Sequence, residues 1–121
     1  MKRYKPTSKS RRAMTTISYG DILTTQKPEK SLTHGYRRQV GRNNSGKITT
    51  RHKGGGHKRL FREVDFRYDK INIPYTLKTV EYDPNRSAFI GIAQYRDGEK
   101  RYVLVPQGVK VGEMFLTSET A

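Results

Sequence analysis

The stretch AFIGIAQYRDGEKRYVLV, residues 88–105, contains the strongest fold signal in the chain. The apolar run at 88–95 is typical of a strand buried on both faces, and Gly91 within it predicts a bulge or a barrel corner. Asp97 and Gly98 separate this run from a second β-rich run at 101–105. Because an Asp-Gly pair between two such runs favours a tight turn, the sequence predicts an antiparallel hairpin.

Three further runs also have β character. Residues 75–82 are rich in β-branched and aromatic side chains, and residues 113–117 suit a last strand. Residues 60–68 alternate in polarity, which predicts a first strand. One face of that first strand would carry Leu60, Val64, Phe66 and Tyr68.

The segment between the second and third predicted strands has the composition of a turn. Asp83 and Pro84 stand at the first and second positions expected of a type I turn, followed by Asn85 and Arg86. Five short strands with little helix predict an all-β fold. We expect a small five-stranded barrel of the oligonucleotide-binding (OB) type over residues 60–117, followed by a polar tail at 118–121.

Upstream of the predicted barrel the composition changes completely. Residues 41–59, GRNNSGKITTRHKGGGHKR, contain five glycines, six Lys or Arg, two histidines and no acidic residue. Burial of so few apolar groups cannot offset the conformational entropy that this segment would lose on becoming ordered. A fixed conformation here therefore requires a partner. We therefore predict that residues 1–59 form a basic, largely irregular extension that binds something negatively charged.

The charge is divided very unevenly along the chain. Residues 1–62 carry seventeen Lys or Arg against two acids, a formal charge of +15. Residues 63–121 carry eight against nine, a charge of −1, which gives the net charge of +14. This asymmetry points to nucleic acid rather than a membrane, because no Trp or Phe precedes Phe61 and no apolar run approaches a membrane span. The absence of cysteine excludes disulfides and thiolate metal sites.

One short motif suggests nucleotide chemistry but is incomplete. Gly41, Gly46 and Lys47 have the spacing of a phosphate-binding nucleotide loop. The next residue is Ile48, where a Ser or Thr would bind magnesium, and no apolar strand precedes Gly41. The motif therefore does not predict nucleotide hydrolysis.

Metal binding and acid–base catalysis are equally poorly supported. His52 and His57 have no Cys or nearby carboxylate to complete a tetrahedral zinc site. Glu63 and Asp65 share a predicted strand face with Arg67, which is more typical of a salt-bridged surface than of a catalytic pair. We predict no catalysis, no metal and no cofactor.

The glycine triplet at 54–56 is the most informative local feature of the extension. Residues without a Cβ let the backbone approach another chain closely, and their N–H groups can converge on an anion. A flexible linker remains an alternative interpretation. The residues of the extension predicted to bind nucleic acid are Arg37, Arg38, Arg42, Asn43, Asn44, Lys47, Arg51, His52, Lys53, Gly54, Gly55, Gly56, His57, Lys58 and Arg59.

Several long motifs in the chain resemble one known family. GRNNSGKITTRHKGGGHKRLFREVDF at residues 41–66, EYDPNRSAFI at 81–90 and DGEKRYVLVPQGVKVGE at 97–113 resemble the universal large-subunit ribosomal protein family L2. KPTS at 5–8, followed by two arginines, resembles the start of bacterial-type members and argues against a transit peptide.

This resemblance implies that the extension threads through large-subunit rRNA and that an OB-type barrel follows it. The arginine of the PNRS motif contacts rRNA in the family, which implies the same role for Arg86 and places Asn85 at the interface. The neighbouring cations of the predicted barrel complete the candidate set: Arg62, Lys100 and Arg101.

The resemblance also implies the partners and the location. They are large-subunit rRNA and neighbouring ribosomal proteins in a ribosome, either in a bacterial cytoplasm or in an organelle. Family members normally continue into a second, SH3-like domain, which we do not find among residues 1–121 and which a separate chain could carry. A free single-stranded nucleic-acid chaperone, or an OB module like those of translation factors, stays open as the alternative function.

Overall fold

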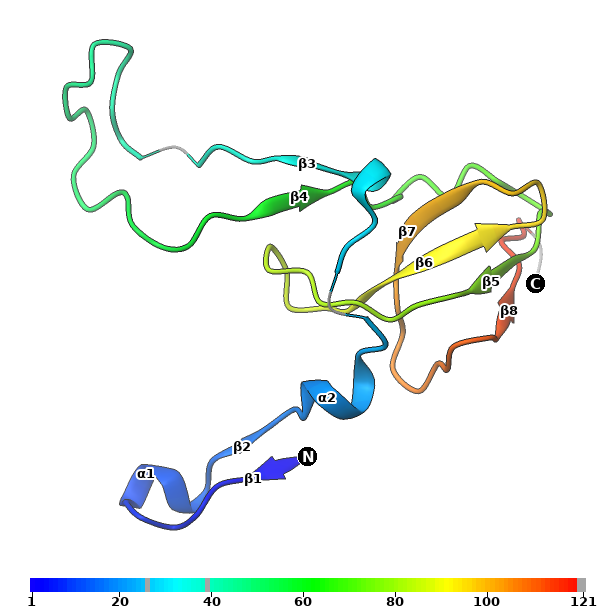
Figure 1. Ribbon diagram of the computed structural model, residues 1–121, viewed down its shortest axis with the longest axis horizontal. Helices are drawn as coiled ribbons and strands as arrows, with labels where there is room; N and C mark the ends of the chain where they lie inside the picture. Colours follow the sequence, from blue (N-terminus) through cyan, green and yellow to red (C-terminus); the bar gives the residue numbers. More distant parts are fainter. Residues whose placement is uncertain (26, 39, 120–121) are drawn as a thin grey trace.

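The computed structural model describes residues 1–25, 27–38 and 40–119 (Figure 1). Its centre is a four-stranded antiparallel sheet with the strand order β7-β6-β5-β8. The prediction of an all-β fold of the OB type is confirmed, although the sheet does not close into a barrel. The strands are β5 (Tyr75–Leu77), β6 (Ile90–Tyr95), β7 (Lys100–Leu104) and β8 (Met114–Phe115).

The predicted hairpin forms the middle of this sheet. β6 pairs with β7 in continuous register from Ile90 opposite Leu104 to Gln94 opposite Lys100. Gly98 has a φ of 90°, which the turn requires and which glycine adopts without strain. β6 is almost entirely buried, as its apolar composition predicted.

Gly91 was expected to mark a bulge or a barrel corner, but it lies in regular register opposite Val103. The extra residue is instead in the adjacent segment, where residues 78–80 span a distance that two residues of β6 cover. The carbonyl oxygen of Thr79 lies so close that a Cβ on Gly91 would be 2.4 Å from it. Gly91 therefore accommodates the bulge of its neighbour.

The prediction of a first barrel strand over 60–68 is wrong in both length and pairing. Only β4 (Leu60–Arg62) is a strand, and it pairs with β3 (Thr33–Gly35) outside the main sheet. The side chain of Asp65 accepts hydrogen bonds from two backbone N–H groups, those of Arg67 and Tyr68, and this turn ends the extended run. Phe66 is consequently 60% exposed rather than buried.

The loss of this strand explains why the barrel stays open. After β4 and before β5, the described chain forms one β-bridge with the main sheet, a parallel bridge from Val64 to Tyr102 on β7. The second and fifth predicted strands exist but are short, because the bulge at 78–80 interrupts the former and only two residues of the latter pair. We refer to residues 63–117 as the sheet domain.

Buried side chains form one cluster on each side of the sheet. The first contains Leu77, Val80, Ala93, Tyr95 and Val103. The second contains Ile90, Ile92 and Tyr102, and Leu32 from the extension packs against it. The core is therefore small and is partly covered by the N-terminal half of the chain.

The extension begins with a small structured arm, which is residues 1–22. Two short strands, β1 (Lys2–Arg3) and β2 (Thr15–Thr16), pair on either side of α1 (Lys9–Arg12). α2 (Tyr19–Ile22) follows and leads to the sheet domain. The arm is thus less irregular than the sequence predicted.

The next part of the extension is fixed to the sheet domain by hydrogen bonds. The N–H of Thr24 donates to the carbonyl of Val80 over 3.0 Å, and the N–H of Val80 donates back to the Thr24 hydroxyl over 2.9 Å. The N–H of Glu29 donates to the buried hydroxyl of Tyr102 over 2.8 Å. The short 3-10 helix η1 (Lys30–Leu32) then leads into β3. The boundary expected between the extension and the barrel, at residues 59 and 60, falls at the start of β4 and would separate β4 from its partner β3.

Candidate nucleic-acid interface

The β3–β4 pair carries a long loop away from the sheet domain (Figure 1). We call β3 and β4 the stem and residues 36–59 the basic loop. The stem is held in register by Thr33 opposite Arg62, His34 opposite Phe61 and Gly35 opposite Leu60. The sequence did not predict β3, because Thr-His-Gly has no strand pattern of its own. The stem fixes where the basic loop begins and ends.

The middle of the basic loop, residues 41–50, is a small hairpin of its own. The carbonyl of Gly41 accepts hydrogen bonds from the N–H groups of Thr49 and Thr50, over 2.8 and 3.2 Å. The side-chain oxygen of Asn43 accepts a hydrogen bond from the N–H of Lys47 over 2.9 Å. Asn43, predicted as an RNA contact, therefore also shapes the turn that presents Lys47.

The glycine triplet is a bent segment with left-handed backbone angles. Gly54, Gly55 and Gly56 have φ values of 119°, 75° and 82°, which side chains with a Cβ rarely adopt. The guanidinium of Arg38 donates to the carbonyl of Gly55 over 3.0 Å, and a Cβ on Gly56 would lie 2.3 Å from that guanidinium nitrogen. Arg38 thus braces the bend from the opposite side of the loop.

The charged side chains of the basic loop are all exposed. Within the described residues, none of them forms an ion pair with a carboxylate. The exposed cations and histidines of the basic loop are Arg37, Arg38, Arg42, Lys47, Arg51, His52, Lys53, His57, Lys58 and Arg59. Asn44 is exposed as well. Such a surface has the chemistry to bind a row of phosphates.

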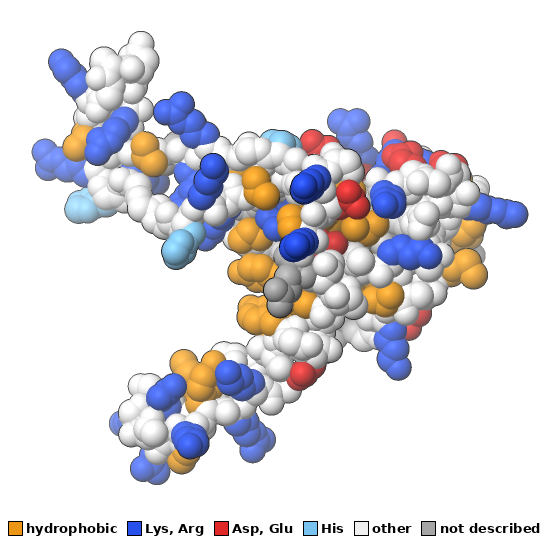
Figure 2. Space-filling model, in the orientation of Figure 1, with side chains coloured by type: hydrophobic (Ala, Val, Ile, Leu, Met, Phe, Trp, Pro, Cys, Tyr) orange, Lys and Arg blue, Asp and Glu red, His pale blue; other side chains and the backbone are white. Residues whose placement is uncertain are grey.

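Figure 2 shows how the charges divide over the molecule. Lys and Arg side chains cover the two projections, which are the arm and the stem with its basic loop, whereas acidic side chains gather on the sheet domain. The arm contributes six exposed cations that the predicted site did not include: Lys2, Arg3, Lys5, Lys9, Arg11 and Arg12. The number of cations in the arm was the only sequence signal that could have added them to the predicted site.

A buried carboxylate joins the stem to the sheet domain. Asp83 has no exposed surface, and its carboxylate accepts a hydrogen bond from Nε of Arg86 over 2.6 Å. Nη1 of Arg62 lies 3.9 Å from the same carboxylate and donates to the carbonyl of Leu60 over 2.8 Å. The amide of Asn85 donates to that Leu60 carbonyl over 2.8 Å.

These contacts distinguish the predicted barrel residues from one another. Arg62 is only 8% exposed and anchors the stem, so its geometry does not support contact with a phosphate on the RNA surface. Arg86 is partly buried above the ring of Phe66, 5.4 Å from its centroid. Asn85 fixes the turn against the stem. The sequence could not reveal these roles, because the shared partner, Asp83, is distant from Arg62 in the chain.

The remaining predicted cations lie among acidic side chains. Lys100 pairs with Glu29 over 3.7 Å. Arg101 donates to Asp65 over 2.8 Å and to Glu99 over 2.6 Å. We call the group around Arg101 the ion cluster; its members are Asp65, Asp69, Lys70, Asp97, Glu99 and Arg101. The cluster has four carboxylates and only two cations, so the charge of Arg101 is fully compensated, which does not support Arg101 as a phosphate ligand.

The ion cluster shifts the titration of its carboxyl groups. Hydrogen bonds from Lys70 lower the pKa of Asp97 and of Glu99, and Arg101 lowers that of Glu99 further. Burial alone would raise the pKa of Asp65, but the hydrogen bonds that it accepts from Arg101 and the backbone lower the pKa below its ordinary value. The cluster therefore favours the ionised carboxylates.

Two other kinds of site were sought over the described residues. No group of three His, Cys, Asp or Glu side chains among them is placed to hold a metal ion. None of the helices in the described ranges is long and apolar enough to cross a bilayer.

Comparison with known families gives one match that spans most of the chain. Residues 29–117 match the family described as Ribosomal Proteins L2, RNA binding N-terminal domain. The match begins at Glu29, where the extension is fixed to Tyr102, and it includes the stem, the basic loop and the whole sheet. The chain belongs to the RNA-binding N-terminal domain family of ribosomal proteins L2, the rRNA-binding structural proteins of the large ribosomal subunit.

Proposed function

We propose that the basic loop is the main rRNA-binding element, and that the chain holds closely packed rRNA segments together by neutralising their phosphates. The observation that carries this proposal is the charge of the loop: every Lys and Arg in it that the structure describes is exposed and unpaired with any described carboxylate. Close packing of RNA strands requires such compensation of phosphate charge.

The shape of the loop supports recognition of folded RNA rather than of a free single strand. The bend at Gly54, Gly55 and Gly56 is held by a hydrogen bond from Arg38, and the turn at Asn43 is closed by the Asn43 side chain. Backbone and cations are therefore presented in a defined order, which suits readout of phosphate positions in a folded RNA. We propose that the chain has no catalytic role.

The arm would act as a second RNA-binding element. Its six cations lie on a projection separate from the basic loop, and Tyr4 carries two of them, with Lys2 and Arg11 over its ring at 5.4 and 5.5 Å. Two separate cationic projections from one small domain can contact two RNA segments at once. We propose that this bridging is how the chain contributes to assembly of the large subunit.

The test is the salt dependence of binding to large-subunit rRNA, with a short unstructured RNA as competitor. The logarithm of the affinity falls with the logarithm of the salt concentration by a slope of about 0.9 per phosphate contact in duplex regions. We expect Lys53→Ala to reduce this slope by about one contact. Lys110→Ala is the control, because Lys110 is an exposed cation outside both projections. A slope that Lys53→Ala leaves unchanged, or binding that the short RNA abolishes, would contradict the proposal.

A further inference from the structure

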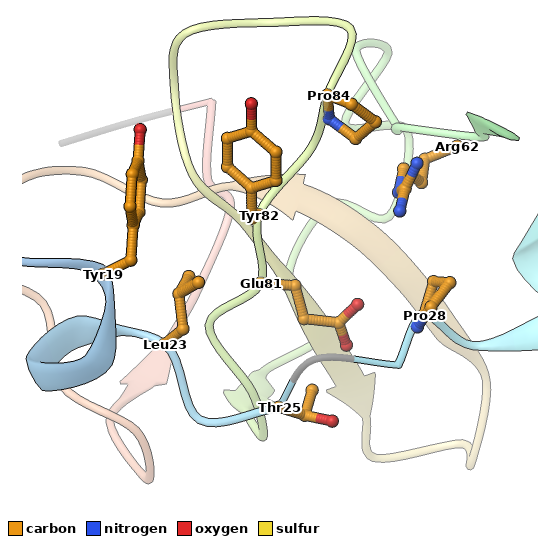
Figure 3. A pocket seen from close by; sticks show the side chains of 8 residues that line it. All are labelled: Tyr19, Leu23, Thr25, Pro28, Arg62, Glu81, Tyr82 and Pro84. Atoms are coloured by element: carbon orange, nitrogen blue, oxygen red, sulfur yellow. The ribbon is translucent and has the colours of Figure 1, made fainter. Parts of the chain in front are cut away.

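A pocket of about 370 Å3 lies where the two projections meet the sheet domain (Figure 3). One side is formed by Tyr19 of α2, at the root of the arm, and another by Arg62 of the stem. Tyr82 and Pro84, from the turn that contains Asp83, lie between them. Figure 2 shows hydrophobic side chains gathered in the angle between the two projections. An RNA strand held by both projections would pass over this place.

The walls of the pocket are aromatic and unusually open. Tyr19 is 51% exposed and Tyr82 is 47% exposed. Their rings pack edge to face, with centroids 5.4 Å apart, which fixes the orientation of both. Pro28 and Pro84 add flat apolar surface. Fixed, half-exposed aromatic rings are the surface on which unstacked bases bind.

The pocket also has a buried hydrogen-bond donor without a partner. The side chain of Arg62 is 9% exposed, and within the described residues its Nε has no hydrogen-bond acceptor. Glu81, which lines the pocket too, already accepts hydrogen bonds from Thr79 and Tyr102. The group without a partner in this pocket is therefore Nε of Arg62, a cationic donor, and a ligand that satisfied it would need a hydrogen-bond acceptor on its edge.

A nucleobase combines the two required properties. It is flat and aromatic, and its edge carries carbonyl or ring-nitrogen acceptors. We propose that this pocket receives one unstacked base of the bound RNA, with its face against Tyr82 or Tyr19 and its acceptor edge turned to Arg62. The inference rests on the proposed function. An apolar peptide would contact the same walls, but it would leave Nε of Arg62 without an acceptor and would lie between two cationic projections.

The site can be tested by ultraviolet crosslinking of the full chain to intact large-subunit rRNA, followed by digestion and mass spectrometry. We expect a single-nucleotide adduct on Tyr82 or Tyr19. Tyr82→Leu keeps the apolar bulk but removes the ring, so it should abolish the Tyr82 adduct and weaken rRNA binding roughly tenfold, within the range measured for loss of one base stack. Its salt slope should not change, because no phosphate contact is lost.

Two variants serve as controls. Tyr82→Phe keeps the ring and should bind rRNA like the unchanged chain. Leu116→Ala removes a side chain that is 57% exposed on another part of the surface, and it should also bind normally. If Tyr82→Leu binds as tightly as the unchanged chain and no adduct forms in the pocket, the inference is overturned, and the pocket is then empty or serves a protein. Failure of the unchanged chain to bind rRNA specifically would instead overturn the proposed function.

Discussion

Tyr102 connects the extension to the sheet domain, and replacing it with Phe isolates that connection. Its hydroxyl donates to the carboxylate of Glu81 over 2.8 Å and accepts the N–H of Glu29 over 2.8 Å. Tyr102 is fully buried and Glu81 is 3% exposed. The substitution keeps the ring and the packing, but it removes one donor from a buried carboxylate and one acceptor from a backbone N–H.

The size of the effect follows from the two bonds lost. A hydrogen bond to a charged group contributes about 1.5–3 kcal/mol, and a bond between neutral groups about 1 kcal/mol. Tyr102→Phe should therefore lower the free energy of unfolding by about 2.5–4 kcal/mol. In a domain of this size, each kcal/mol lowers the melting temperature by roughly 4–8 °C. We expect a loss of at least about 10 °C.

The chain provides a closely matched control in Tyr95. It is 2% exposed and lies on the strand next to that of Tyr102, but its buried hydroxyl has no hydrogen-bond partner in the described part of the chain. Because a buried hydroxyl without a partner costs free energy, Tyr95→Phe should leave the stability unchanged or raise it by about 1 kcal/mol.

Urea denaturation followed by circular dichroism measures both variants, and amide hydrogen exchange at Glu29 reports the connection itself. Tyr102→Phe should accelerate exchange at Glu29, whereas Tyr95→Phe should not. Equal losses of stability in the two variants would refute the reasoning, since they would show that the hydrogen-bond partners of the hydroxyl do not set the cost.

Three further substitutions and one change of pH test the folding and the RNA binding of the chain. Gly91→Ala should destabilise the sheet by roughly 1–3 kcal/mol through its clash with Thr79, with no change in the salt slope of rRNA binding; an unchanged melting temperature would contradict this. Gly55→Val should weaken rRNA binding more than it lowers the melting temperature, because Gly55 has a φ of 75° that valine rarely adopts but has open space around it. Equal losses in both assays would show that Gly55 is needed for folding. Arg86→Ala should weaken rRNA binding by about 1–3 kcal/mol and also lower the melting temperature, since Asp83 would lose its closest cation; loss of neither would contradict both roles. The lowered carboxyl pKa values of the ion cluster give stability that is present above about pH 4 and is lost as the pH falls further, so melting curves between pH 7 and pH 3 should show a decline that begins near pH 4.

The features that the sequence predicted well depend on neighbouring residues. Asp97 and Gly98 define a turn by their own conformational preferences, and the apolar run before them can only be buried. The excess of cations in the first 62 residues is likewise independent of the fold. These local signals were sufficient to predict an all-β protein that binds nucleic acid, whereas RNA was implied by the resemblance of the longer motifs.

The features that it missed depend on distant partners. β3 has no strand pattern and exists because β4 pairs with it. Arg62 looks like one more exposed cation, but Asp83 and the carbonyl of Leu60 hold it inside. Phe66 fits an alternating strand, yet the turn made by Asp65 leaves it exposed. Periodicity cannot reveal where a side chain finds its hydrogen bonds.

The stem has a consequence for the energetics of recognition. A free segment as long as residues 36–59 would lose about 3 kcal/mol of chain entropy when its two ends were brought together on a target. Because β3 and β4 already hold those ends side by side, that loss occurs when the protein folds and not when it meets RNA. Affinity for RNA is thus coupled to the strength of the stem, and a substitution that opens the stem would weaken binding without removing any contact to the RNA.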